Sequence, residues 1–273
     1  MRRGYADLHL HTHYSDGLCS PAEVMEAAAR ADLSWVAITD HDTVEGLDEG
    51  SAAAQRLGIG FVPAVELSVD LCGQDLHILA YWIDAADPDL LSLLEQMSQS
   101  RIARARRIIS RLHALGVRLS MEAVRKQAHR SRSLGRAHIA RALVEAGETG
   151  SFADAFARYL GFGAPAYVAK ETASPSEALR VIRAARGVPV LAHPGICRMD
   201  GAWEILLEGG LQGLETEHPM HSARQVARLR RLAEQHDLVT TGGSDFHGGG
   251  YPQSSVGGTR VEADVLDRLY ARR

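Results

Sequence analysis

Cysteine is rare in this chain, and long apolar runs are absent. The three cysteines, Cys19, Cys72 and Cys197, are far apart and form no CxxC pair, which argues against a disulfide framework and against a thiolate zinc site. We expect each of them to be a small buried residue. No stretch approaches the roughly 18 apolar residues that a membrane span needs, and the start of the chain runs into a strand pattern without a secretory signal. A cytoplasmic location is the expectation that follows.

Aromatic residues and lysines are also scarce. Aromatics make up 5% of the 273 residues, and the only lysines are Lys126 and Lys170. Little aromatic surface is therefore available to stack the bases of a long single strand, and a formal net charge of −4 gives no general coat for nucleic acids. The 45% hydrophobic content is enough for the core of one barrel-sized domain. We expect a soluble globular protein with no membrane contact and no stable protein partner.

The apolar pattern alternates between strand-like and helix-like in both outer parts of the chain. Ser20-Pro21-Ala22-Glu23 is a capping box with proline at the first helical position, and Asp87-Pro88 begins a long stretch, to about residue 161, that is helical throughout. Strands are expected at 6–12, 35–39, 61–69, 75–83, 188–192, 213–217 and 238–242. This order predicts an α/β fold with a parallel barrel of residues 1–86 and 162–273 and a helical insert at 87–161.

Side chains of the metal-binding type recur where the predicted strands end. In a parallel barrel these ends form one rim, which is where active sites are built. Alternation places His9 and His11 on the same face of their strand. Imidazoles and carboxylates without thiolates suit Zn, Mn or Fe, and bridging carboxylates permit several ions. The residues concerned are His9, His11, Asp40-His41-Asp42, Glu66, His77, His193, Asp245 and His247.

The ordered motifs "DLHLHTHYSDG", "ITDHDT", "VPAVELS", "HILAY", "LAHPG" and "GGSDFHG" resemble those of the polymerase-and-histidinol-phosphatase (PHP) family of metal-dependent phosphoesterases. The resemblance covers nearly the entire chain. It implies a distorted, TIM-like (β/α)7 barrel that holds two or three divalent ions, with Mn favoured and Fe or Zn as alternatives.

The same resemblance implies a set of metal ligands. His9, His11, Glu66 and Asp245 would surround one ion, and Asp16, His41 and His247 would hold a second. Glu66 would bridge to a third ion that His77 and His193 also bind. His13, the third histidine of "HLHTH", falls where the family pattern asks for no particular residue.

Phosphate-ester hydrolysis needs an activated water and a neutralised phosphoryl group, and clustered ions supply both. We expect a metal-bridging hydroxide to attack phosphorus in line with the leaving oxygen. Asp40 and Asp42 flank His41 and are candidates for orienting its imidazole, with helix capping as an alternative for Asp42. His218 and a metal-bound water are both candidates for the acid that protonates the leaving group.

The predicted insert is strongly basic. Between Arg101 and Arg141 there are twelve Lys and Arg residues against one acid, Glu122. Within it, "SLGRAHIARALVEAG" places Arg136 and His138 at a helix start, where a helix N-terminus and a guanidinium together favour an anion. This stretch, with "FARYLGFGAPAYV" and "GLETEHPMHS", resembles the subfamily of nucleoside 3',5'-bisphosphate phosphatases and 5'-to-3' exonucleases of short RNA. The resemblance implies that Arg136 and His138 bind the second phosphate of the substrate, with Lys170 and His218 as further candidates.

Four reactions or roles are compatible with these patterns. The first is hydrolysis of a small nucleotide, a nucleoside 3',5'-bisphosphate such as the adenosine form, to AMP and phosphate; the second is stepwise cleavage of short 5'-phosphorylated oligoribonucleotides. A C–N hydrolase of the amidohydrolase type also begins with HxH, but many such enzymes bridge their metals with a carbamylated lysine, and both lysines lie outside the predicted strands. A non-catalytic metal-binding module is disfavoured because the ligand set is complete.

Overall fold

Eight strands form one sheet in the order β7-β6-β5-β4-β3-β2-β1-β8. The computed structural model describes residues 4–71, 74–128, 131–197, 199, 201–249 and 255–273. The strands are β1 (Tyr5–Leu10), β2 (Leu33–Ile38), β3 (Gly60–Leu71), β4 (Gln74–Tyr81), β5 (Val188–Leu191), β6 (Gly213–Glu217), β7 (Val239–Gly242) and β8 (Val261–Glu262). The helices are α1 (Pro21–Arg30), α2 (Leu47–Leu57), α3 (Pro88–Ala114), α4 (Met121–Gln127), α5 (Arg136–Glu145), α6 (Phe152–Ala155), the π-helical turn η1 (Phe156–Leu160), α7 (Pro175–Ala184), α8 (Ala202–Glu208), α9 (Ala223–Gln235) and α10 (Val265–Tyr270).

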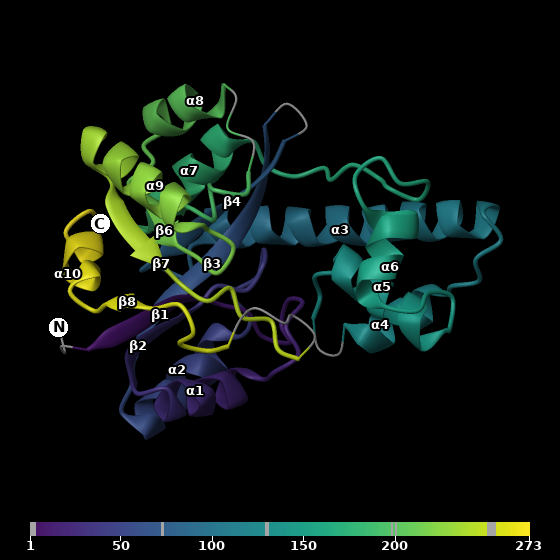
Figure 1. Ribbon diagram of the computed structural model, residues 1–273, viewed down its shortest axis with the longest axis horizontal. Coiled ribbons are helices and arrows are strands. Elements are labelled where there is room, and N and C mark those ends of the chain that lie inside the picture. Colours follow the sequence, from purple (N-terminus) through teal and green to yellow (C-terminus); the bar gives the residue numbers. More distant parts are fainter. Residues whose placement is uncertain (1–3, 72–73, 129–130, 198, 200, 250–254) are drawn as a thin grey trace.

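The sheet curls into a nearly closed barrel. The backbone N–H of His11, just after β1, donates to Phe246 O, just after β7, at 2.8 Å and so ties the two sides of the sheet together. Helices α7, α8 and α9 lie along one side, and α1 and α2 lie along the other (Figure 1). Helix α3 leads away from the barrel and carries α4, α5 and α6. The expected α/β barrel with helices inserted into it is confirmed.

One part of the expected topology is wrong, namely that the sheet is parallel throughout. Strand β4 pairs antiparallel with both β3 and β5, and β8 pairs antiparallel with β1. Strands β3 and β4 form a hairpin, and its short connection leaves no room for the crossover helix that a parallel pair requires. As a consequence, His77 reaches the rim from the N-terminal half of β4, whereas a parallel strand would have delivered it from its C-terminal end.

The helix starts follow the capping signals in the sequence. The Ser20 side chain accepts from the backbone N–H of Glu23 at 3.2 Å, and the Glu23 carboxylate accepts from the backbone N–H of Ser20 at 2.7 Å. Helix α7 begins in the same way, with the Ser174 side chain accepting from Glu177 N–H at 3.2 Å. Because each bond satisfies an N–H that the helix itself leaves free, these boundaries are defined locally.

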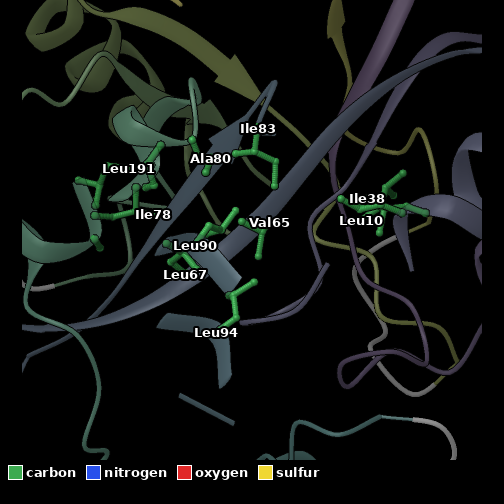
Figure 2. Close-up of a cluster of buried hydrophobic side chains, with 14 of the residues drawn as sticks. Leu10, Ile38, Val65, Leu67, Ile78, Ala80, Ile83, Leu90, Leu94 and Leu191 are labelled. Atoms are coloured by element: carbon green, nitrogen blue, oxygen red, sulfur yellow. The ribbon is translucent and has the colours of Figure 1, made fainter. Parts of the chain in front are cut away.

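The barrel interior below the rim is filled by apolar side chains. Val62 and Ala64 are buried on the same face of β3 as Glu66, and Leu79 and Tyr81 on the same face of β4 as His77. A second cluster lies between the sheet and the surrounding helices, where Leu90 and Leu94 of α3 lie beside β3 (Figure 2). The polar donors at the rim therefore rest on a largely apolar floor.

Helix α3 contributes side chains to two hydrophobic cores. Its first half packs on the barrel through Leu90, Leu94 and neighbouring residues, whereas Ile108 and Leu112 pack against α4, α5 and η1. We call the part of α3 after Arg101, together with α4, α5, α6 and η1, the helical lobe. The lobe has a hydrophobic cluster of its own. The continuous helix α3 connects it to the barrel.

The two described cysteines are less buried than the sequence predicts. Cys19 and Cys197 are free but only half-buried, so the expectation of full burial is wrong for both, while Cys72 lies outside the described residues. Of the helices that the structure describes, none combines the length and the apolar character needed to cross a bilayer.

The separate core of the helical lobe generates a stability prediction. Leu112→Ala removes a side chain that is 0% exposed, and it should lower the free energy of unfolding in urea by about 2–5 kcal/mol because it leaves a cavity. Leu115→Ala, at the end of the same helix and 47% exposed, is the matched control and should change it by less than about 0.5 kcal/mol. Equal losses in the two variants would show that the lobe has no core of its own.

Candidate metal centre

One buried carboxylate, Glu66 on β3, lies among five imidazoles. Its Oε1 is 2.9 Å from His77 Nδ1 and 3.2 Å from His193 Nε2. Its Oε2 is 3.0 Å from His41 Nδ1 and 3.2 Å from the Nε2 atoms of His9 and His11. Glu66 is 0% exposed. The two oxygens thus face two different sets of imidazoles, as a carboxylate that bridges two cations would.

His9 and His11 converge as the alternation of their strand predicts. Their Nε2 atoms lie 3.1 Å apart, and Asp245 Oδ1 lies 3.4 Å from the first and 3.2 Å from the second. Gly243 permits this approach, because a Cβ at that position would come within 2.4 Å of His9. Residues from β1, β3 and the segment after β7 therefore meet at one point.

A second group of donors lies on the lobe side of His11. Asp16 Oδ1 is 3.3 Å from His247 Nε2 and 3.9 Å from His41 Nε2. Donor atoms of His11, Asp16, His41 and His247 all lie within 4.8 Å of one another, as do those of His9, His11 and Glu66, and those of His41, Glu66 and His77. His13 belongs to none of these three groups among the described residues. All nine residues expected as ligands are brought together at the rim.

The orientation of these atoms fits metal ions better than hydrogen bonds. His41 Nδ1 and His77 Nδ1 are each close to a Glu66 oxygen, yet neither makes a hydrogen bond there, and Asp16 Oδ1 is buried without a hydrogen bond as well. Such lone pairs are costly to bury unless a cation accepts them. The three groups contain only nitrogen and oxygen donors, which suits Mn, Fe or Zn.

Burial and neighbouring charges shift the pKa values of the donor groups. Burial alone would raise the pKa of Glu66, but His41, His77 and His9 hold it well below its ordinary value. Burial opposes charge on His11 as well, but Asp245 and Glu66 raise its pKa to about 10. For His41 burial prevails and lowers the pKa to about 4, which leaves its imidazole neutral and able to coordinate a cation at neutral pH. Cation binding at His11 has to displace a proton.

Glu215 on β6 is a site residue that the sequence reasoning missed. It is fully buried, and its two oxygens accept from His9 Nδ1 at 2.9 Å and from the backbone N–H of His193 at 2.8 Å. A carboxylate on the far nitrogen of a ligand histidine fixes the ring orientation and its tautomer. The sequence alone did not single it out, because the predicted strand "GLETE" carries two acids, Glu215 and Glu217, and only the first is fully buried.

Asp40 and Asp42 do not bind the His41 ring, so the expectation that they orient it directly is corrected. Asp40 accepts from Thr12 N–H at 2.7 Å and from the Ser15 hydroxyl at 2.5 Å, and so holds the turn that precedes Asp16. Asp42 accepts from Arg101 Nε at 2.6 Å and from Ser68 N–H at 2.7 Å. Asp40 therefore fixes a loop, and Asp42 ties the barrel to α3.

His218 lies directly beside the donor cluster. Its Nδ1 accepts from Met220 N–H at 3.2 Å, and its Nε2 is 3.3 Å from Asp245 Oδ2. The first bond places the ring proton on Nε2, which faces Asp245. The residue is 5% exposed. The His218 ring can therefore contact a ligand that is bound at the Asp245 carboxylate.

A basic cavity opens next to the donors. It is lined by Asp16, His41 and His77 on the barrel side and by Arg101, Arg104, Arg136 and Lys170 on the other, together with Asp75, Gly135, Ala137 and Phe156. Lys170 Nζ lies 2.8 Å from Asp75 Oδ1, and Arg136 lies 3.8 Å from Asp75 Oδ2. Arg101 is paired with Asp42, so Arg104, Arg136 and Lys170, with Asp75 interposed, give this wall the positive charge that an anionic group requires.

His138 does not line that cavity. Its side chain is 1% exposed, and its Nδ1 accepts from Gly135 N–H at 3.0 Å, at the start of α5. Burial lowers its pKa to about 4, so the ring is neutral at neutral pH. This position favours a structural role at the helix start, whereas Arg136 and Lys170 line the cavity.

Comparison with known proteins gives a consistent result. The model of the PHP domain matches residues 7–159. A 3',5'-nucleoside bisphosphate phosphatase of Chromobacterium violaceum is 35% identical over 93% of this chain and 90% of its own length. A 5'-3' exoribonuclease of Haemophilus influenzae is 34% identical over 88% of this chain and 89% of its own length.

Solved structures match over nearly the full length. The crystal structure of a proposed metal-dependent phosphoesterase from Bifidobacterium adolescentis has a TM-score of 0.91 and 32% identity, covering 98% of this chain and 96% of that one. A structure of an amidohydrolase from Chromobacterium violaceum has a TM-score of 0.90 and 33% identity, covering 98% of this chain and 97% of that one. Both likenesses extend over the barrel and the helical lobe together.

The buried contact between Glu215 and His9 generates a prediction about metal binding. Glu215→Ala should weaken Mn²⁺ binding by about 10- to 100-fold, because loss of the carboxylate frees the ring of His9; calorimetric titration measures this directly. Glu217→Ala is the matched control on the same strand, since Glu217 pairs with Arg230 at the surface. Wild-type affinity in the Glu215 variant would contradict the role given to it.

Proposed function

This chain belongs to the PHP domain family, and on that basis we propose that it is a metal-dependent phosphohydrolase that removes one phosphate from a nucleoside 3',5'-bisphosphate, such as the adenosine form. One observation carries the proposal. Three of the clustered donors, Asp16, His41 and His77, line the same cavity as the cationic side chains Arg101, Arg104, Arg136 and Lys170. Such a site offers two separate places for phosphate on one small molecule. The name of the Chromobacterium phosphatase, 35% identical, supports the same substrate class.

We assign the ligands in three sets. His9, His11, Glu66 and Asp245 hold one ion; Asp16, His41 and His247 hold a second; and Glu66 with His77 and His193 holds a third. The separations reported above, all 3.9 Å or less within the stated contacts, support each set. When bound, ions of this kind, Mn²⁺ first among them, would acidify a water for the nucleophilic role and would neutralise charge on the phosphoryl oxygens. No serine or cysteine nucleophile is then needed.

The residues of the chain itself bind and orient the substrate. Arg136 and Lys170 hold the phosphate that is not cleaved, through charge-assisted hydrogen bonds. Asp75 neutralises part of their charge and fixes both side chains on one wall. Binding of the second phosphate adds affinity and places the first phosphate against the donor cluster. His218, whose Nε2 faces Asp245, and a metal-bound water are the two candidates for the acid that protonates the leaving oxygen.

A second substrate, short 5'-phosphorylated RNA, remains in competition with the first. The Haemophilus relative is named a 5'-3' exoribonuclease, and two further relatives of 33% identity carry the same activity in their names. A terminal 5'-phosphate on an oligonucleotide and the 5'-phosphate of a bisphosphate present the same group to Arg136 and Lys170. The substrate that is consumed faster decides between them.

C–N hydrolysis is the weaker alternative, although the Chromobacterium structure is named an amidohydrolase. Neither lysine can bridge metals here. Lys126 pairs with Glu145 on the surface of the lobe, and Lys170 pairs with Asp75. Glu66 occupies the bridging place instead. A module without catalysis would not need the cationic wall beside its metal donors.

The experiment that tests the proposal is a phosphate-release screen. Mn²⁺-loaded protein is offered adenosine 3',5'-bisphosphate, the two adenosine monophosphates, histidinol phosphate and a 5'-phosphorylated trinucleotide. We expect release from the bisphosphate, and none from it with Asp245→Ala or His41→Ala, with unchanged circular dichroism. Retained activity in both variants would contradict the metal assignment. A trinucleotide consumed faster than the bisphosphate would make the chain an exonuclease.

The cationic wall generates a separate prediction about affinity. Arg136→Ala should raise KM for adenosine 3',5'-bisphosphate by about 10- to 100-fold with kcat little changed, because it removes a hydrogen-bonded charge partner of the second phosphate. The KM for adenosine 3'-monophosphate, which lacks that phosphate, should change far less. Arg132→Ala is the control, since Arg132 is exposed and pairs with Glu45 outside this cavity. An equal effect on both substrates would refute the assignment.

A further inference from the structure

Phe162 is an exposed aromatic residue that the metal centre does not explain. Its side chain is 86% exposed, more than any other large apolar side chain in the described residues. Nevertheless it lies in a well-bonded turn. Ala164 N–H donates to Gly161 O at 3.0 Å, and Tyr167 N–H donates to Ala164 O at 2.9 Å. Gly163 supports the turn with φ at +76°, a conformation that favours glycine.

This ring lies near the wall of the catalytic cavity. The Phe162 and Tyr167 rings meet edge to face with centroids 5.4 Å apart. Arg136 Cζ lies 5.7 Å from the Tyr167 centroid and 5.7 Å from the Phe156 centroid. Phe156 and Arg136 both line the cavity. An aromatic surface therefore continues from the phosphate-binding arginine outward to Phe162.

The turn is also fixed to α3. Arg104 Nε donates to Val168 O at 2.9 Å, and Arg111 donates to the backbone carbonyl of Tyr167. Burial and the nearby Arg136 and Arg101 lower the pKa of Arg104 to about 10, so it stays charged at neutral pH. Because two arginines hold its backbone, the Phe162–Tyr167 segment keeps a set place relative to the cavity.

We propose that Phe162, supported by Tyr167, is the platform on which the nucleobase of the substrate stacks. The inference rests on the proposed function and adds the part of the site that recognises a nucleoside. A bisphosphate held by the donor cluster and by Arg136 has its base as its remaining flat, apolar group. Base–aromatic stacking tolerates any base, because every base has a π-face, so the platform selects nucleotides over other phosphate esters.

The size of the surface favours a base over a protein partner. Protein interfaces on monomers need contiguous apolar patches of several hundred Å², whereas Phe162 and the half-buried Tyr167 offer two rings. The other exposed large apolar side chains of the helical lobe, Leu115 and Val144, lie at the ends of α3 and α5. One small platform beside one phosphate-binding wall matches a single nucleotide.

The test compares two substrates that differ only in the base. Adenosine 3',5'-bisphosphate is set against methyl ribofuranoside 3,5-bisphosphate, which keeps both phosphates and carries a methoxy group in place of adenine. Phe162→Ala should lower kcat/KM for the nucleotide by about 5- to 150-fold and leave that for the base-free ester unchanged. Phe162→Trp should retain activity on the nucleotide, and Leu115→Ala is the exposed apolar control.

Each result supports or overturns the platform. A loss on both substrates would mean that the turn acts through the fold, and a loss on neither would mean that Phe162 does not touch the base. If wild-type protein hydrolyses neither substrate, the proposed function fails. In that case, titration of the Phe162→Trp variant with adenosine 5'-monophosphate decides the platform separately. Quenching of its fluorescence beyond that of the wild type supports stacking, and its absence overturns it.

Discussion

Five imidazoles meet the two oxygens of Glu66 in a place where the carboxylate has no exposed surface. Burying a carboxylate in this way is costly unless cations surround it. The imidazoles hold the pKa of Glu66 well below its ordinary value against the effect of burial. The backbone conformations and contacts around the site bring these five imidazoles to the one carboxylate of Glu66.

Several local departures from regular structure serve this convergence. His193 and Asp245 have φ values of +33° and +50°, a region that side chains other than glycine rarely adopt and that costs free energy. Gly243 lets the segment after β7 approach His9. The antiparallel direction of β4 brings His77 to the rim.

The helical lobe is joined to this centre through a buried ion pair. Asp42 directly follows His41 and also has a positive φ, of +55°. It binds Arg101 of α3, which in turn donates to Ser68 Oγ at 2.9 Å. Arg101 lies on the same wall as Arg136 and Lys170. Helix α3 therefore ties one wall of the cavity to the residue that follows His41, so the cavity wall and the donor cluster share a common frame.

The sequence predicted much of this because its signals are local. The capping residues Ser20 and Ser174 mark helix starts, and the HxH pair shares a strand face by alternation alone. The direction of β4 could have been read from the sequence, because only five residues separate the expected strands at 61–69 and 75–83, too few for the crossover of a parallel pair. Glu215 was missed because its role depends on His9, 206 residues away. The burial of His138 and the contact between Asp42 and Arg101 likewise arise only when the lobe packs on the barrel.

We propose that Glu66 bridges cations at the rim of this barrel. Anomalous diffraction from bound Mn²⁺ tests this bridging role. Crystals grown with Mn²⁺ and measured on both sides of the manganese absorption edge should show ions at both Glu66 oxygens, one of them also near His9 and His11. A further ion is expected near Asp16 and His247. Ordered crystals with no anomalous peak within coordination distance of Glu66 would contradict the account.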